Sequence, residues 1–306
     1  MSVGWPGCHG VRLSHEPPVD VGHSHGTPIV DASLELGEVA APAGEELWRL
    51  RAAVDTAAGP IEAEQRLWLE ADGSSVVRTN RGAALEVDPR ARTIRSHAPE
   101  VRTLAQLVVN YGFPLLLATH DVVVVHAAAA ARDGRAVLVA GPSGSGKSST
   151  LVGLVDAGWQ AISEDLCAID LRDDVPRVWP GPPWVRRLRG EPGPAGSTQR
   201  FETIDKVAWD LEPSQTNAPV PVALVAVVRG HGSGEAVGAV DRTAAPALLA
   251  DHVVWLGRAG EQGRSLFPRL LRLSARVPVV SLRVPRSATW LGGVPGVFTE
   301  LLAGAT

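Results

Sequence analysis

Cysteine is nearly absent from this chain of 306 residues, which holds two cysteines, one methionine and one tyrosine. Two cysteines, Cys8 and Cys167, are too few for a disulfide framework or a zinc site. They are consistent with a reducing compartment, where thiols stay unpaired. An excess of charge of one sign is also missing, because the net charge is −4 and charged residues make up 20%. A global basic field that would attract nucleic acid or an anionic membrane is therefore absent.

Long apolar runs are lacking as well. The most apolar stretch, residues 104–130, is interrupted by Asn110, His120, Asp121 and His126, so it does not fit a membrane span. The first residues show no basic segment followed by an apolar one, as a signal peptide has. We expect a cytoplasmic protein that binds neither nucleic acid nor membrane.

Apolar residues make up 45% of the chain, enough for a sizeable core in one large or two ordinary domains. Residues 1–28, rich in Gly, Pro and His, predict a flexible N-terminal arm. Residues 29–119 predict a small β-rich domain with an antiparallel sheet that ends in a helix, because short alternating runs are separated by turn signals such as Asp72-Gly73. Residues 120–306 predict a second domain, where strand and helix patterns mix, so the fold class is α/β.

Element patterns in the second domain are distinct enough to place. We expect strands over 121–126, 136–140, 166–171, 220–228 and 277–284, and helices over 148–157, 243–255, 265–275 and 297–302. A turn signal at Asp133-Gly134 separates the first two strands, which therefore predict an antiparallel hairpin.

A glycine-rich motif follows that hairpin. Residues 141–148 read Gly-Pro-Ser-Gly-Ser-Gly-Lys-Ser, which matches the phosphate-binding P-loop (Walker A) pattern. Its glycines let backbone N–H groups face phosphate oxygens, and the helix that follows adds its positive N-terminal end. Lys147 is expected to reach the β- and γ-phosphates, and the Ser148 hydroxyl to bind Mg²⁺. The residues predicted to bind ATP or GTP with Mg²⁺ are Gly141, Ser143, Gly144, Ser145, Gly146, Lys147, Ser148 and Ser149.

An acidic pair, Glu164-Asp165, follows the motif, with Asp165 eighteen residues after Lys147. A helix of about 10 residues advances about 15 Å, and a returning strand brings the chain back beside the loop. A carboxylate there can hold magnesium or take a proton from an attacking hydroxyl, so both acids are candidate catalytic residues and metal ligands. The alternative is a surface turn with two solvated acids. His126, which ends a valine run, could face the same site or be structural.

Residues 126–170 resemble the core of the HPr kinase/phosphorylase family, which has a histidine at the start of a hairpin, a P-loop, a helix and a paired acid before a hydrophobic strand. His126 lies fifteen residues before Gly141, in agreement with the family. The run His126-Ala127-Ala128-Ala129 and the proline-rich stretch 180–188 are similar to HPr-kinase-like enzymes that tailor peptide natural products, including lasso peptides.

The resemblance implies a P-loop in a mixed sheet of the HPr kinase and phosphoenolpyruvate carboxykinase type. It also implies phosphoryl transfer to a serine hydroxyl of a peptide or protein, and it makes a homo-oligomer an expectation. Carried over by position, Lys147 becomes a catalytic phosphate ligand and His126 matches the family's active-site histidine. Glu164 stands where the family usually has aspartate, so the division of roles between the two acids stays open. We favour Asp165 as general base and Glu164 as metal ligand.

Other assignments stay open at this point. Arg186, Arg187 and Arg189 are candidates to meet phosphate or an acidic substrate, or they form a solvated basic run. A small-molecule P-loop kinase also places an acid one helix beyond the loop, although such enzymes start near the loop and 140 residues precede Gly141 here. A non-catalytic nucleotide sensor would bind ATP and transfer nothing. No motif selects ATP over GTP.

Overall fold

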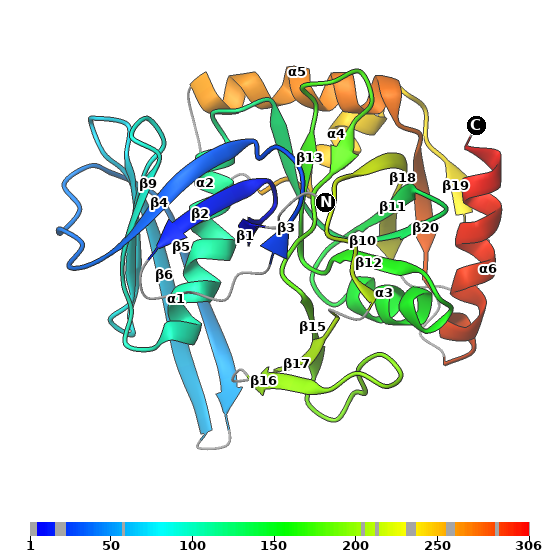
Figure 1. The fold of residues 1–306 in the computed structure, drawn as a ribbon, viewed down its shortest axis with the longest axis horizontal. Helices are drawn as coiled ribbons and strands as arrows, with labels where there is room; N and C mark the ends of the chain where they lie inside the picture. The colour runs from blue at the N-terminus through cyan, green and yellow to red at the C-terminus, as the bar shows by residue number, and fades with distance from the viewer. Residues whose placement is uncertain are drawn as a thin grey trace. The chain divides into compact units, whose positions relative to one another are not determined.

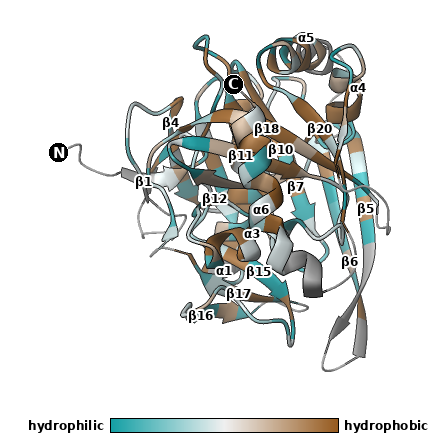
Figure 2. Ribbon diagram, turned by 90° about the vertical axis from the view of Figure 1, so that its right-hand side faces the viewer, coloured by the Kyte–Doolittle hydropathy of each residue, from teal (hydrophilic) through white to brown (hydrophobic). Residues whose placement is uncertain are grey.

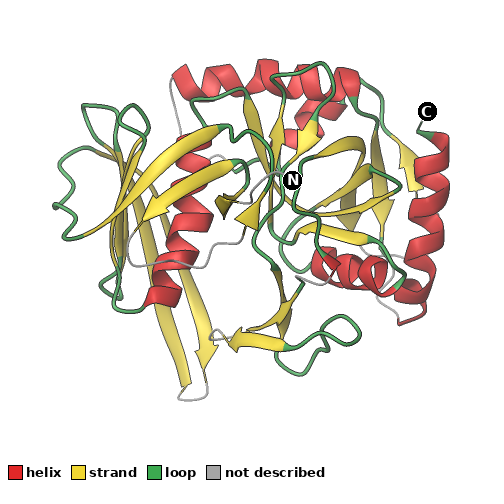
Figure 3. Cartoon of the chain, viewed as in Figure 1, coloured by secondary structure: helices red, strands yellow, loops and turns green. Residues whose placement is uncertain are grey.

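The computed structural model describes residues 5–15, 23–56, 59–202, 206–211, 214–230, 237–254, 261–284 and 288–305. The chain divides into two compact units, residues 1–121 with 255–264 and residues 122–254 with 265–306. Each unit combines helices with a large mixed sheet, which confirms the α/β prediction (Figures 1 and 3). Among the described residues, no helix combines the length and the apolar character that a membrane span requires.

The first unit contains a nine-stranded sheet in the order β3-β1-β2-β4-β9-β8-β7-β6-β5. Its strands are β1 (Trp5–Cys8), β2 (Val11–His15), β3 (His23–Ser24), β4 (Val30–Leu36), β5 (Glu45–Thr56), β6 (Gly59–Leu69), β7 (Ser75–Thr79), β8 (Ala84–Asp88) and β9 (Thr93–His97). A helical stretch follows as α1 (Val101–Leu107), η1 (Val108–Gly112) and α2 (Phe113–Leu117). Gly112 permits a close approach to β9, because a Cβ there would lie 3.0 Å from Cδ1 of Ile94.

The expectation of a flexible arm over residues 1–28 is wrong for the part that the structure describes. Three strands form there, and β2 pairs in parallel with β4. Cys8, Val11 and Leu13 are buried, so this segment supplies core side chains to the sheet. The sheet is therefore larger than expected, and it is mixed where an antiparallel sheet was predicted, because β4 also pairs in parallel with β9. The alternation of apolar and polar residues in these short strands cannot be told from the sequence of an unpaired tail unless the partner strand is known.

The second unit contains an eight-stranded sheet in the order β11-β10-β13-β14-β18-β20-β19, with β12 beside β10 and a further pairing of β11 with β18. Its strands are β10 (Val122–Arg132), β11 (Arg135–Ala140), β12 (Gln160–Ser163), β13 (Leu166–Asp170), β14 (Arg177–Val178), β18 (Val220–Gly230), β19 (Val237–Ala239) and β20 (Val279–Arg283). A separate three-stranded sheet has the order β15 (Trp184–Leu188), β17 (Lys206–Asp210) and β16 (Gln199–Glu202). The helices are α3 (Lys147–Asp156), α4 (Ala245–Ala250), α5 (Glu261–Arg276) and α6 (Ala288–Gly304).

Both faces of the central strands of this sheet are buried. One face packs with leucines of α4 and α5, and the other packs with apolar side chains of α3 and α6. The strands β10, β11 and β18 are accordingly brown in the hydropathy colouring of Figure 2. The run Ala127–Ala131 lies in β10, although alanine favours helices. Strand pairing on both of its edges, to β11 and to β12, overrides that propensity.

The hairpin predicted around Asp133-Gly134 is confirmed. β10 and β11 pair antiparallel up to Arg132 and Arg135, and both turn residues have positive φ, 52° and 71°. Positive φ at both positions is what a type I′ turn requires, and an Asp-Gly pair supplies it. The helix expected over 243–255 is shorter, as α4 ends at Ala250. Val253 instead forms a bridge with Val125 of β10.

Candidate functional site

Strand β10 changes partners in its middle. Residues 127–132 pair with β11 on one edge and residues 129–131 pair with β12 on the other, whereas residues 122–126 pair with β13. β11 ends at Ala140, which lies opposite Ala127 on one edge of β10. On the other edge, the connection of β12 to β13 passes the same point, where the N–H of Ala127 donates to the carbonyl oxygen of Asp165 at 3.1 Å. The glycine-rich loop leaves the carboxyl end of β11, whose parallel neighbour is β18, and ligands of α/β sheets bind outside the carboxyl ends of such strands.

The glycine-rich loop, residues 141–146, joins β11 to α3. Gly144 and Gly146 have φ of 75° and 93°, a left-handed backbone that favours glycine. A Cβ on Gly141 would lie 2.7 Å from Oγ of Ser145 and 3.0 Å from Cβ of Val228. The Ser145 hydroxyl is buried and has no hydrogen-bond partner within the described residues. The loop is thus a tight backbone cradle with one unsatisfied hydroxyl.

Lys147 is the first residue of α3, and its side chain is 6% exposed. Its ammonium group donates to the carbonyl oxygens of Gly141 and Pro142 at 2.8 and 2.9 Å. Burial lowers the pKa of Lys147, and the nearby carboxylates of Asp165 and Glu164 oppose that shift. The ammonium therefore lies against the glycine-rich loop, whose phosphates it is expected to bind.

Glu164 is buried beside the start of α3. The Ser148 hydroxyl donates to Oε1 of Glu164 at 2.6 Å, and Nε of Arg186 donates to Oε2 at 3.2 Å. The contact of Ser148 with Glu164 brings the glycine-rich motif and the acidic pair together, as their spacing in the sequence predicts. It also excludes the alternative of a solvated turn for Glu164, whose side chain is 5% exposed.

Asp165 lies between Arg186 and His126. Arg186 donates to one carboxylate oxygen, and Nδ1 of His126 lies 3.2 Å from the other. Burial acts to raise the pKa of Asp165, but the guanidinium of Arg186 beside it holds that pKa below its ordinary value. Burial lowers the pKa of His126, although Asp165 opposes the shift. At neutral pH the pair is thus an ionised carboxylate beside an uncharged imidazole.

The three arginine candidates lie in three different surroundings. Arg186, on β15, joins both acids and is 17% exposed. Arg187 donates to the Ser149 hydroxyl at 2.6 Å, so that hydroxyl is engaged away from the loop. Arg189 pairs with Glu202 and is 55% exposed. The sequence alone could not select Arg186, because it reaches the acids from the separate three-stranded sheet.

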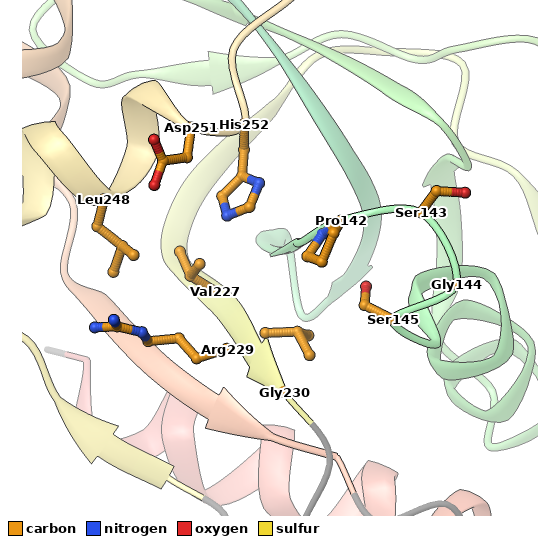
Figure 4. A pocket seen from close by; sticks show the side chains of 11 residues that line it. Pro142, Ser143, Gly144, Ser145, Val227, Arg229, Gly230, Leu248, Asp251 and His252 are labelled. Atoms are coloured by element: carbon orange, nitrogen blue, oxygen red, sulfur yellow. The ribbon is translucent and has the colours of Figure 1, made fainter.

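A cavity of about 370 Å³ lies beside the glycine-rich loop (Figure 4). Its lining consists of Pro142, Ser143, Gly144, Ser145, Val227, Val228, Arg229, Gly230, Leu248, Asp251 and His252. The carbonyl oxygen of His252 accepts a hydrogen bond from the N–H of His126 at 2.7 Å, so this residue connects the cavity wall to β10. Sequence reasoning did not find these residues of β18 and α4, since no motif marks them.

The oxygen atoms at this site suit magnesium. Ser148 and Glu164 offer a hydroxyl and a carboxylate within hydrogen-bond distance of each other. Within the described residues, no group of three or more histidine, cysteine, aspartate or glutamate side chains forms a metal cage. Mg²⁺ commonly binds through one or two carboxylates together with substrate phosphates, and that mode fits this donor set.

Comparisons with known proteins give a weak structural likeness and no family or sequence match. No protein-family model matches the chain, and no curated protein matches it in sequence. Among solved structures, the "Structure of the Hpr(Ser) kinase/phosphatase from Coxiella burnetii" is similar over 60% of this chain and 99% of that chain. The identity is 12% and the TM-score is 0.33, and at this level the likeness assigns no activity to the chain.

Proposed function

We propose that this chain is a nucleotide-dependent kinase that transfers a phosphoryl group to a serine hydroxyl of a peptide or protein. The observation that carries the proposal is the convergence of the glycine-rich loop and the acidic pair. Ser148 contacts Glu164, and His126 contacts Asp165, so both acids lie beside the start of α3 and the middle of β10. Binding of triphosphate and activation of a hydroxyl are thereby available within one site.

The loop and Lys147 would bind the phosphates. Backbone N–H groups of a left-handed glycine loop face an anion, and the N-terminal end of α3 adds its positive field. The ammonium of Lys147 would exchange the carbonyls of Gly141 and Pro142 for phosphate oxygens. The unsatisfied hydroxyl of Ser145 would gain a phosphate oxygen as acceptor. Each of these contacts neutralises charge on a triphosphate.

Ser148 and Glu164 would hold Mg²⁺. When bound, the ion neutralises negative charge on the β- and γ-phosphates. Glu164 has the more buried carboxylate and lies against the Ser148 hydroxyl, which supports its assignment as metal ligand. In the structure the guanidinium of Arg186 donates to Oε2 of Glu164. It would have to leave that oxygen when Mg²⁺ binds there, because two cations cannot share the position.

Asp165 would act as general base. Its depressed pKa keeps the carboxylate ionised at neutral pH, so it can accept the proton of the attacking hydroxyl. The hydroxyl oxygen forms a bond to the γ-phosphorus, the bond from that phosphorus to the bridging oxygen breaks, and the nucleoside diphosphate leaves. His126 and Arg186 position the carboxylate and stabilise its charge.

The acceptor rests on the resemblance to kinases that tailor peptide natural products, which supports a serine of a small peptide. The test is incubation with γ-labelled ATP or GTP and the peptides encoded beside the gene, followed by mass spectrometry of each peptide. We expect label on a serine with the wild type and none with Asp165→Asn. Asp174→Asn, which changes a fully exposed aspartate, is the matched control and should keep full activity. Equal labelling by wild type and Asp165→Asn would remove Asp165 from the mechanism.

A non-catalytic nucleotide sensor is the second candidate, and one observation favours it. Arg186 pairs with both carboxylates, which lowers the basicity that a general base needs. A sensor would bind ATP with Mg²⁺ and release no ADP with any acceptor. Measurement of ADP release over many hours, in wild type and Asp165→Asn, separates the sensor from the kinase.

A further inference from the structure

The cavity of Figure 4 contacts the loop that is proposed to hold phosphates. Four of its lining residues, 142–145, belong to that loop, and the remainder come from the end of β18 and from the segment at α4. A ligand whose phosphates occupy the loop must extend its non-phosphate part into neighbouring space. The cavity provides that space.

Strand order separates this cavity from the acids. β18 lies beside β11 on one side, with Val227 opposite Ala140, whereas β10 and then the β12–β13 connection lie on the other side. Phosphoryl transfer proceeds roughly in line, so the acceptor and the leaving nucleotide lie on opposite sides of the transferred group. If the acceptor stands at Asp165, the leaving group stands on the β18 side of the loop.

The lining also has suitable chemistry. Leu248, Val227 and Pro142 provide apolar walls, and Figure 4 shows them around the ring of His252. Asp251 supplies acceptor oxygens and Arg229 supplies donors. Small-molecule sites combine apolar walls with a few polar groups and span about 300–1,000 Å³, and this cavity lies within that range. Burial lowers the pKa of His252, so its ring is uncharged at neutral pH and offers a flat face to another ring.

Another cavity, beside α3, does not compete for this role. It is lined by Ser149, Asp156, Arg187, Gly193 and other residues around α3, and it includes none of residues 141–146. It therefore does not touch the glycine-rich loop.

We infer that the cavity formed by residues 142–145, the end of β18, Leu248, Asp251 and His252 is the subsite for the nucleoside of the bound nucleotide. The inference rests on the proposed function, because it needs the triphosphate in the glycine-rich loop. In it, Leu248 and Val227 contact the base, His252 stacks on the base, and Asp251 accepts hydrogen bonds from nucleoside N–H or O–H groups.

Calorimetric titration of the full chain with Mg·ATP, Mg·GTP and magnesium inorganic triphosphate tests this inference. The wild type should bind one or both nucleotides at least about tenfold more tightly than triphosphate. Leu248→Arg places a long charged side chain in the cavity, so it should remove that preference and leave triphosphate affinity unchanged. Leu271→Arg, the same change at a half-exposed leucine of α5 outside the cavity lining, is the matched control and should keep the preference.

His252→Gln is the second variant, in case Leu248→Arg does not fold. It should reduce the preference for nucleotide about tenfold or more while triphosphate binding persists. If folded Leu248→Arg and His252→Gln still bind nucleotide more tightly than triphosphate, the nucleoside subsite is overturned. The proposed phosphate site, which depends on Lys147, would stand. Absence of binding of all three ligands by the wild type would overturn the proposed function as well.

Discussion

The Ser148 hydroxyl, in the first turn of α3, donates a 2.6 Å hydrogen bond to Oε1 of Glu164, sixteen residues further along the chain. The bond links the helix after the glycine-rich loop to the turn between β12 and β13. It brings together two oxygen donors that suit Mg²⁺. The contact depends on the length of the Glu164 side chain, which lets its carboxylate reach the Ser148 hydroxyl.

Glu164→Asp should weaken the affinity for the Mg²⁺ that supports nucleotide binding. Removal of one methylene withdraws the carboxylate by about 1.5 Å, beyond reach of the Ser148 hydroxyl. We expect the Mg²⁺ concentration for half-maximal nucleotide binding to rise about tenfold. The measurement is nucleotide titration at several Mg²⁺ concentrations. Glu86→Asp, on β8 of the other unit, should leave the curve unchanged, and an identical curve for Glu164→Asp would argue against a metal role for Glu164.

Lys147→Ala should reduce nucleotide affinity. A hydrogen bond to a charged group contributes about 1.5–3 kcal/mol, which corresponds to a loss of about tenfold to hundredfold. Calorimetry with Mg·ATP and Mg·GTP gives the dissociation constants. The folded state should persist, because the ammonium donates to the carbonyls of Gly141 and Pro142, which belong to its own loop. Unchanged affinity for both nucleotides would disprove a phosphate-binding loop.

Arg186→Ala should destabilise the second unit strongly. The change leaves Glu164 and Asp165 as adjacent carboxylates with their shared cation removed, and breaking a buried ion pair costs about 3–5 kcal/mol. Urea unfolding measures the difference. Arg189→Ala, which removes an exposed pair with Glu202, is the control and should cost about 1 kcal/mol or less. Equal costs for the two variants would mean that the Arg186 cluster is solvated.

Stability should fall as the pH drops through the range in which histidine gains its proton. Burial lowers the pKa of His126 in the folded state, so the unfolded chain binds the proton more readily. The contribution of His126 is therefore fully present above the unfolded pKa of about 6.5 and is lost as the pH falls toward the folded value. We expect the free energy of unfolding, measured with denaturant between pH 5 and 8, to change less with pH in His126→Gln than in wild type.

Gly141→Ala should disturb the loop. The added Cβ would stand 2.7 Å from the Ser145 hydroxyl and 3.0 Å from Val228, a buried strand residue that cannot easily move. Overpacking of this kind costs about 1–3 kcal/mol, and triphosphate affinity should fall with it. Gly37→Ala has open space around the new Cβ and is the control. Urea unfolding and triphosphate titration of both variants check the prediction.

Local pattern accounts for the elements that the sequence predicted. The Asp-Gly pair fixed the hairpin of β10 and β11, because two positive φ values suit those residues. The arm was misjudged since β1 and β2 are stable only through pairing with one another and with β4, a non-local contact. The sheet of the first unit was underestimated for the same reason.

The sequence by itself determined the glycine-rich loop, the helix after it and the return of Glu164-Asp165 toward Ser148, because spacing along one strand, one loop and one helix sets those positions. Only the tertiary structure decided that Arg186, of three arginines, pairs with both acids, and that Asp251 and His252 line a cavity beside the loop. Their elements are joined to the loop by sheet pairing over long sequence separations, which no local pattern encodes.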